Sequence, residues 1–170
     1  MVPAVIDVVG DIPVIAAGGI ADGRGLATVL MLGAEGAWIG TRFVASAEAA
    51  TQDWMKDHIA RTDIDGTVLT KAYDLTANSA FPLDVGDRVL SNEFTRQCHE
   101  GDEEVVRNRA ELQQQVAAGT EARDMSVVPV RAGSAVGLLS SIEPAGVILL
   151  RIVEEAKAIL KKRPSEVLAR

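Results

Sequence analysis

The chain has 170 residues, of which 48% are hydrophobic and 24% are charged, and its formal net charge at pH 7 is −7. This composition is typical of a globular protein, and the length fits one domain. The acidic excess argues against nucleic acid and anionic lipid as partners, because both carry negative charge. No apolar run reaches the roughly 20 residues that a membrane-spanning helix needs.

The start of the chain and its cysteine content predict a cytoplasmic location. Residues 1–5 lack the charged region and the long apolar run of a secretory signal peptide. The single cysteine, Cys98, cannot form an internal disulfide, and it cannot build a thiolate metal cluster from this chain alone. We therefore expect a protein of a reducing compartment without a metal site.

The first part of the chain predicts a strand, a helix and a second strand. Residues 2–9 have the pattern of a short buried helix. Residues 13–17 form a β-branched run that predicts a strand covered on both faces of a parallel sheet. Residues 23–32 have helical spacing after a capping residue, Asp22, and residues 36–39 predict the second strand. This order is that of a βαβ unit.

The remaining elements are less regular. In chain order we expect a helix at 47–61, an edge strand at 67–73, a long loop at 74–88, a polar helix at 102–118 and a connector at 119–130. A last amphipathic helix begins at Glu143 and Pro144 and ends at 161–164. The apolar positions of this helix are Leu149, Ile152, Val153, Ala156, Ile159 and Leu160.

Two glycine loops follow the two predicted strands. Gly18 and Gly19 follow the first, and Gly40 and Thr41 follow the second. Small residues at such positions let backbone amides approach an anion, and a helix start adds a favourable dipole. The loops could also be simple connections, but the pair within one βαβ unit favours a phosphate site. The Gly-x-Gly-x-x-Gly pattern of dinucleotide-binding proteins is absent here.

The segments PVIAAGGIADGRGL at 13–26 and LGAEGAWIGTRF at 32–43 closely resemble the nitronate monooxygenase family. Related flavin-dependent enoyl-acyl-carrier-protein reductases share this text. Residues 88–94 look like the substrate-lid region of the family, and residues 132–145 look like its C-terminal segment. The resemblance covers nearly the whole chain.

The resemblance implies an α/β fold, the C-terminal part of an FMN-binding TIM (β/α)8 barrel with its last two strands and a helical lid segment. Residues 1–66 would be barrel units with the phosphate loops, 67–130 a lid-like insertion, and 131–170 a C-terminal loop and helix. By the same resemblance, FMN phosphate would be held by the backbone amides of Gly18 and Gly19 and, from the other side, by Gly40 and Thr41.

The catalytic histidine of the family lies in a Gly-Gly-His-x-Gly segment, which this sequence does not contain. Neither His58 nor His99 has a convergent partner group, so we predict that neither is a general base. Cys98 and His99 are adjacent, so their side chains point apart, and no third metal ligand is evident. Ser134 stands where many relatives have a glutamine close to the flavin. We assign no catalytic residue from the sequence.

Several further residues of these segments have a purely structural interpretation. We interpret Arg42 as an exposed charge and Phe43 as a core aromatic. Asp22, Asp84 and Asp87 are interpreted as caps and turn formers. Trp38 and Trp54 are interpreted as core residues.

The function implied by the resemblance is oxidation of alkyl nitronates by dioxygen to a carbonyl compound and nitrite, with FMN as cofactor. Whether this chain is itself an active enzyme stays open. The alternatives are an inactive truncated chain, one half of a split flavoprotein, an FMN-dependent enoyl-acyl-carrier-protein reductase and, as the weakest, a phosphate-binding module without flavin. Unpaired strand edges would also favour association with another chain.

Overall fold

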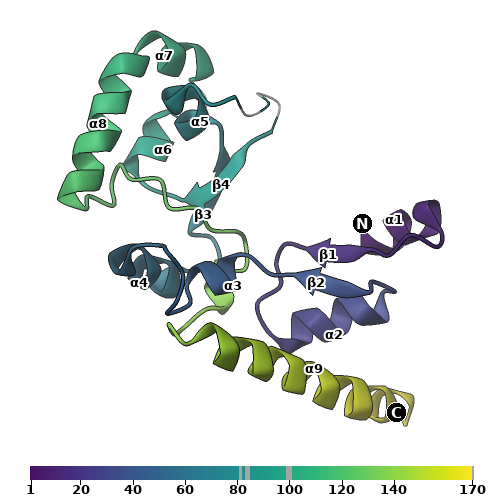
Figure 1. Ribbon diagram of the computed structural model, residues 1–170. Helices are drawn as coiled ribbons and strands as arrows, with labels where there is room; N and C mark the ends of the chain where they lie inside the picture. The colour runs from purple at the N-terminus through teal and green to yellow at the C-terminus, as the bar shows by residue number, and fades with distance from the viewer. Residues whose placement is uncertain (81, 83–84, 99–100, 170) are drawn as a thin grey trace.

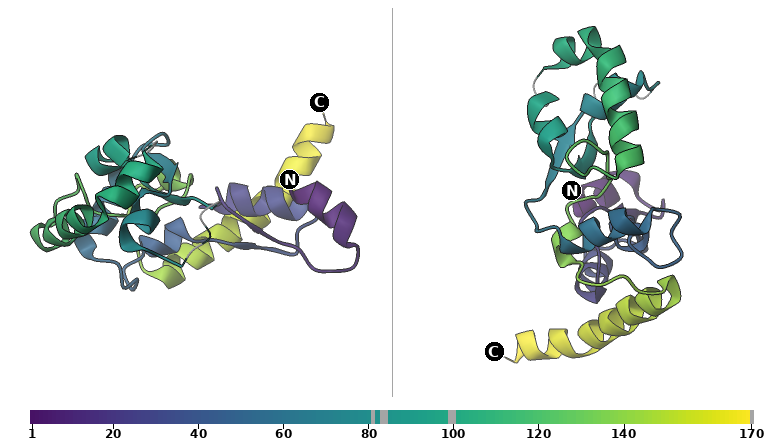
Figure 2. Two further views of the ribbon diagram at one scale, coloured as in Figure 1. Left: turned by 90° about the horizontal axis from the view of Figure 1, so that it is seen from above. Right: turned by 90° about the vertical axis from the view of Figure 1, so that its left-hand side faces the viewer.

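The computed structural model describes residues 1–80, 82, 85–98 and 101–169. Figure 1 shows an α/β arrangement in which a part with two parallel strands lies on the long C-terminal helix, and a mostly helical part lies above it. Figure 2 shows the same two parts at opposite ends of an elongated molecule. The predicted boundaries at 66 and 130 stay predictions.

The first part contains the predicted βαβ unit. Strands β1 (Ile15–Ala17) and β2 (Gly36–Trp38) are parallel, with Ala16 opposite Ala37, and helix α2 (Gly23–Met31) connects them. The other elements of this part are α1 (Val2–Val9), α3 (Thr41–Val44) and α4 (Asp53–Arg61). The helix predicted at 47–61 thus begins later, because residues before Asp53 form turns.

One face of the β1–β2 sheet is not covered by the described residues, so the prediction of a strand covered on both faces is wrong. Ala16, on the face toward α2, is buried, whereas Ile15 on the other face is 52% exposed. Trp38 lies on that same open face and is 74% exposed, which corrects its interpretation as a core residue. Helix α1 has no buried residue, so the prediction of a buried helix at 2–9 is wrong as well.

In the second part, the described residues form an antiparallel pair of strands and four helices. The strands are β3 (Thr67–Thr70) and β4 (Asp87–Leu90), and the helices are α5 (Ala72–Ala77), α6 (Glu93–Cys98), α7 (Asp102–Arg107) and α8 (Arg109–Ala122). The predicted loop at 74–88 is therefore wrong at both ends. The helix predicted at 102–118 is two helices, with a turn at Asn108 between them.

A buried hydrogen-bond network fixes the core of the second part. Phe94 is fully buried and stacks on Tyr73, with ring centroids 4.7 Å apart. The Asn92 side chain donates to the Met125 and Val128 carbonyl oxygens and accepts from the Thr95 amide at 2.9 Å. Burial raises the pKa of Tyr73 to about 12, so the ring stays neutral. Trp54 packs against this core, as predicted.

The C-terminal segment contains the 3-10 turn η1 (Val136–Leu138) and the long helix α9 (Ala145–Leu168). Helix α9 begins after Pro144 as predicted, but it continues through Pro164, so the predicted end at 161–164 is wrong. A proline inside a helix removes one backbone donor and clashes with the carbonyl group four residues earlier, which can kink a helix without ending it. No described helix is long and apolar enough to cross a membrane.

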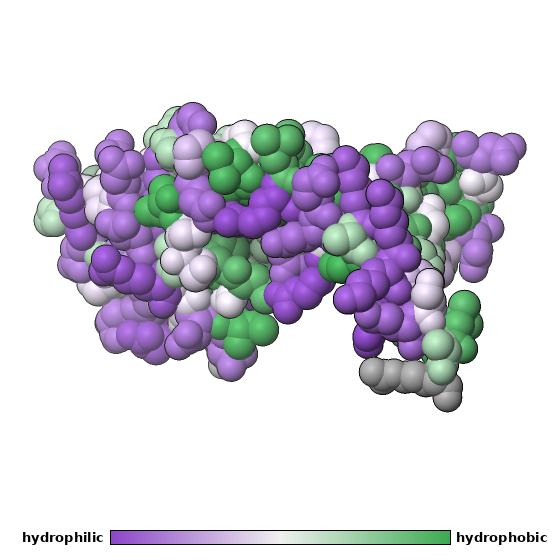
Figure 3. Space-filling model, turned by 90° about the horizontal axis from the view of Figure 1, so that it is seen from below, coloured by the Kyte–Doolittle hydropathy of each residue, from purple (hydrophilic) through white to green (hydrophobic). Residues whose placement is uncertain are grey.

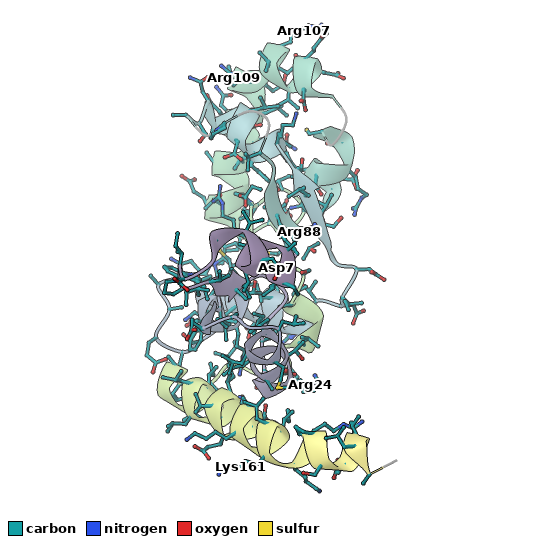
Figure 4. The ribbon with its side chains drawn as sticks, turned by 90° about the vertical axis from the view of Figure 1, so that its right-hand side faces the viewer. Asp7, Arg24, Arg88, Arg107, Arg109 and Lys161 are labelled. Atoms are coloured by element: carbon teal, nitrogen blue, oxygen red, sulfur yellow. The ribbon has the colours of Figure 1, made fainter. Side chains whose placement is uncertain are left out.

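Helix α9 packs along α2, which confirms that its amphipathic pattern faces a neighbour. The buried positions are Ile148, Ile152 and Ala156, one every four residues, whereas Leu149 is 53% exposed, in contrast to the prediction. Figure 4 labels Arg24 at the end of α2 that lies close to α9. Figure 3 shows hydrophobic residues on the surface beside the end of α9.

Candidate functional site

The two glycine loops lie at the carboxyl edge of the β1–β2 sheet. Gly18 has φ of 94° and Gly19 has φ of 71°, conformations that favour glycine. A Cβ atom at Gly18 or Gly40 would meet nothing within 4 Å, so the space beside both loops is open. Within the described residues, the Gly19 and Gly40 amides donate to no backbone or side-chain acceptor.

Thr41 adds a hydroxyl group to these amides. Its Oγ1 accepts a hydrogen bond from the Gly133 amide at 2.8 Å. A Cβ atom at Gly133 would lie 3.1 Å from this oxygen, so glycine permits the close approach. A hydroxyl that accepts one bond can still donate its own proton. The Thr41 proton is therefore free to point toward a ligand in the open space.

The amides at the start of α2 already have acceptors, so they add nothing to an anion site. Asp22 accepts from the Arg24 amide at 2.9 Å and from the Gly25 amide at 3.1 Å, which confirms Asp22 as the predicted cap. Glu155 accepts from the Gly23 amide at 3.0 Å. Burial raises the pKa of Asp22, but the hydrogen bonds from Arg24 and Gly25 outweigh it and leave the pKa below its ordinary value.

Arg42 is buried, in contrast to the prediction of an exposed charge. Its guanidinium donates to the Ser141 carbonyl oxygen at 2.7 Å and to Glu143 Oε1 at 3.1 Å. Arg151 donates to the same oxygen at 2.9 Å. Hydrogen bonds from Arg151 and Ser141 lower the pKa of Glu143 to about 2. This ion-pair cluster holds the segment before α9 against Arg42, which directly follows Thr41 in the second loop.

The remaining candidates do not form a reactive centre. His58 is exposed, as predicted, and His99 lies outside the described residues. Cys98 is buried, and burial raises the pKa of its thiol. Among the described residues no three His, Cys, Asp or Glu side chains form a group that could hold a metal.

The other residues singled out from the sequence have structural places. Asp87, interpreted as a cap or turn former, lies at the start of β4, and its Oδ2 pairs with Arg131 Nε at 2.5 Å. Asp84 lies outside the described residues. Phe43 is half-buried.

Sequence reasoning missed the contacts that come from the C-terminal segment. Gly133 contacts Thr41 across 92 positions of the chain, and Glu155 contacts Gly23 across 132. The spacing of residues within a short stretch of sequence cannot predict contacts over such separations. The only available signal was the resemblance of residues 132–145 to the C-terminal segment of the family.

The chain matches the family described as nitronate monooxygenase over residues 1–155. It is 39% identical to the nitronate monooxygenase npaC of Metarhizium robertsii, covering 94% of this chain and 46% of that protein. It is 32% identical to a nitronate monooxygenase of Neurospora crassa, covering 89% of this chain and 40% of that protein. The chain thus spans about half the length of these curated relatives, or slightly less.

Solved structures agree with this match. FabK from Thermotoga maritima superposes with a TM-score of 0.80 at 35% identity, covering 97% of this chain and 50% of that chain. A nitroalkane oxidase from Streptomyces ansochromogenes superposes with a TM-score of 0.72 at 26% identity, covering 92% and 42%. On the strength of the family match and of these relatives, the chain belongs to the nitronate monooxygenase family of flavoprotein oxidoreductases.

Proposed function

We propose that this chain supplies the phosphate-binding part of an FMN-dependent oxidoreductase of the nitronate monooxygenase type. Gly18 and Gly19 would hold the FMN phosphate from one loop, and Gly40 and Thr41 from the other. The observation that carries the proposal is that one segment touches both loops. Gly133 donates to Thr41 at 2.8 Å, and the next residue, Ser134, lies beside Gly19.

The donor set fits a phosphate group. The free amides of Gly19 and Gly40 and the Thr41 hydroxyl are all hydrogen-bond donors, and a phosphate offers only acceptor oxygens at neutral pH. Both loops follow parallel strands at the same sheet edge, where α/β proteins commonly bind phosphate. Asp22 and Glu155 lie nearby but their oxygens accept from the α2 amides, so they leave the loop amides free.

In this proposal β1, α2 and β2 belong to the last two units of a TIM barrel, residues 67–130 form the lid-like insertion, and residues 131–170 pack back on the barrel. The open sheet face with Ile15 and Trp38 would then point toward the barrel interior. Further strands would pair with the free edges of β1 and β2, either from a longer chain or from a separate one. Strands from a separate chain would correspond to the split-flavoprotein alternative.

The bound FMN would supply the redox chemistry. The proposed substrates are an alkyl nitronate and dioxygen, and the products are a carbonyl compound and nitrite. The described residues of this chain hold and orient the cofactor phosphate through the two loops. We assign no general base, since His58 is exposed and has no convergent partner.

A second candidate function is reduction of enoyl thioesters. It is favoured by the structural similarity to FabK, which has the higher TM-score of the two solved structures described above. The phosphate loops do not distinguish the two reactions, because both use the same cofactor in this proposal. The substrate pocket outside these loops would decide between them.

The proposal is tested by titrating the purified chain with FMN while flavin fluorescence and thermal stability are followed. We expect a fluorescence change and a stabilisation that grows with FMN concentration, because a ligand of the native state stabilises it. A nitronate is then added in the presence of dioxygen and nitrite is assayed. In parallel, an enoyl thioester is added together with a reduced nicotinamide as hydride donor, and the loss of its conjugated double bond is followed. FMN binding without either reaction would support the split or inactive alternatives, and no response to FMN would overturn the proposal.

A further inference from the structure

Ser134 lies between the two glycine loops. A Cβ atom built at Gly19 would be 3.9 Å from Ser134 Oγ, so this hydroxyl lies beside the first loop. The preceding amide, that of Gly133, is bonded to Thr41 Oγ1 in the second loop. The hydrogen bond from the Gly133 amide to the Thr41 side chain thus holds Ser134 next to the second loop, while its hydroxyl lies beside the first.

The Ser134 hydroxyl is not used by the protein itself. The side chain is exposed and forms no hydrogen bond with any residue that the structure describes. A serine hydroxyl has one proton to donate, and its orientation adapts by rotation. The two loops also carry unused donors, the Gly19 and Gly40 amides. Ser134 therefore adds a donor at a place where donors already gather.

We propose that Ser134 Oγ donates a hydrogen bond to the phosphate of FMN, so that residues 133–134 form a third wall of the phosphate site. This inference rests on the proposed function, because it needs FMN between the loops. It differs from the expectation drawn from the family, in which the residue at this position lies close to the flavin. A phosphate contact and a ring contact make different predictions for ligands that lack the phosphate.

The experiment compares Ser134→Ala with the wild-type chain, using FMN and riboflavin as the two ligands. Riboflavin has the same ring and ribityl chain but no phosphate. Since the substitution removes a hydrogen bond to a charged group, we expect it to weaken FMN binding by about tenfold or more. The affinity for riboflavin should stay unchanged. Ser140→Ala, an exposed serine of the same segment, is the control and should alter neither affinity.

Each outcome has a distinct meaning. Equal FMN affinity for Ser134→Ala and the wild type overturns the phosphate contact but leaves the proposed function intact. Equal loss of FMN and riboflavin affinity also overturns it, because the serine would then act on the ring or the ribityl chain. If the wild-type chain binds no FMN, the proposed function itself fails, and this inference fails with it. Thermal unfolding of both variants without ligand checks that the fold is retained.

Discussion

Glu155 of helix α9 accepts a hydrogen bond from the Gly23 backbone amide at 3.0 Å. The contact joins the C-terminal helix to the first residue of α2, directly after the loop that begins at Gly18. A carboxylate at a helix N-terminus satisfies a free amide and interacts favourably with the helix dipole. Helix α9 therefore stabilises the βαβ unit that carries the proposed phosphate loops.

Gly23→Ala should strongly destabilise the chain. The new Cβ atom would lie 2.3 Å from Glu155 Cβ and 2.6 Å from the Ala156 backbone nitrogen, so α9 would have to move away from α2. Such overpacking costs about 1 to 3 kcal/mol in the free energy of unfolding. Urea denaturation followed by circular dichroism measures this loss.

Gly146→Ala is the matched control for this substitution. Gly146 also lies in a helix, but a Cβ atom there meets nothing within 4 Å. Alanine has the higher helix propensity, so we expect a gain of up to about 1 kcal/mol. Equal losses for the two variants would contradict the tight packing of α9 on Gly23.

Glu155→Ala should cost about 1 kcal/mol, the usual contribution of a helix-capping side chain. Its neighbour Glu154 provides the comparison, because Glu154 is exposed and its one ion pair among the described residues is with Lys157, one turn away. Exposed pairs of this kind contribute little, so Glu154→Ala should change the free energy of unfolding by less than about 0.5 kcal/mol. If both variants lose the same stability, the capping role of Glu155 is wrong.

Much of the βαβ unit could be predicted from the sequence because its signals are local. Asp22 accepts from amides two and three residues further along the chain, and capping of this kind is visible in the order of residues. The burial of Arg42 could not be predicted, since its partner Glu143 lies 101 positions away. The exposure of Trp38 could not be predicted either, because the residues around it do not reveal whether another layer covers that face of the sheet.

The candidate site shows the same division. Gly18, Gly19, Gly40 and Thr41 are recognisable because glycine at the end of a strand is a local pattern. The third side of the site, formed by Gly133 and Ser134, depends on how the C-terminal segment returns to the sheet edge. The turn at Asn108 was missed for a different reason, since Arg107 and Arg109 on either side of it are good helix formers.

Glu143→Gln should make the chain less sensitive to acid. The folded pKa of Glu143 is lowered to about 2, below the ordinary value of 4.5, by Arg151 and Ser141. A depressed pKa contributes stability that is present above the unfolded value and is lost as the pH falls toward the folded value. The wild-type urea midpoint should therefore drop between about pH 5 and about pH 2.5, and the variant should drop less.

The control for the acid experiment is Glu121→Gln. Glu121 is exposed on helix α8, and it takes part in no ion pair among the described residues. This variant should follow the wild-type pH dependence. If Glu143→Gln also follows it, the ion-pair cluster around Arg42 does not contribute to acid sensitivity.

The exposed face of the sheet can be followed through its tryptophan. The chain has two tryptophans, of which Trp38 is 74% exposed and Trp54 packs against the core. With Trp54→Phe, the remaining Trp38 fluorescence should be quenched readily by acrylamide. With Trp38→Phe, the Trp54 signal should be protected. Strong protection of Trp38 in the purified chain would show that another copy or chain covers this face, as the free strand edges would favour.

The central claim is that the two glycine loops bind the phosphate of FMN, and phosphorus NMR observes that group directly. On addition of the wild-type chain, we predict that the FMN phosphate signal broadens and shifts. With Gly19→Val, the signal should return to its position in free FMN, because a β-branched residue does not tolerate the φ of 71° at this position. An FMN signal that stays at its free position with the wild-type chain would contradict the account.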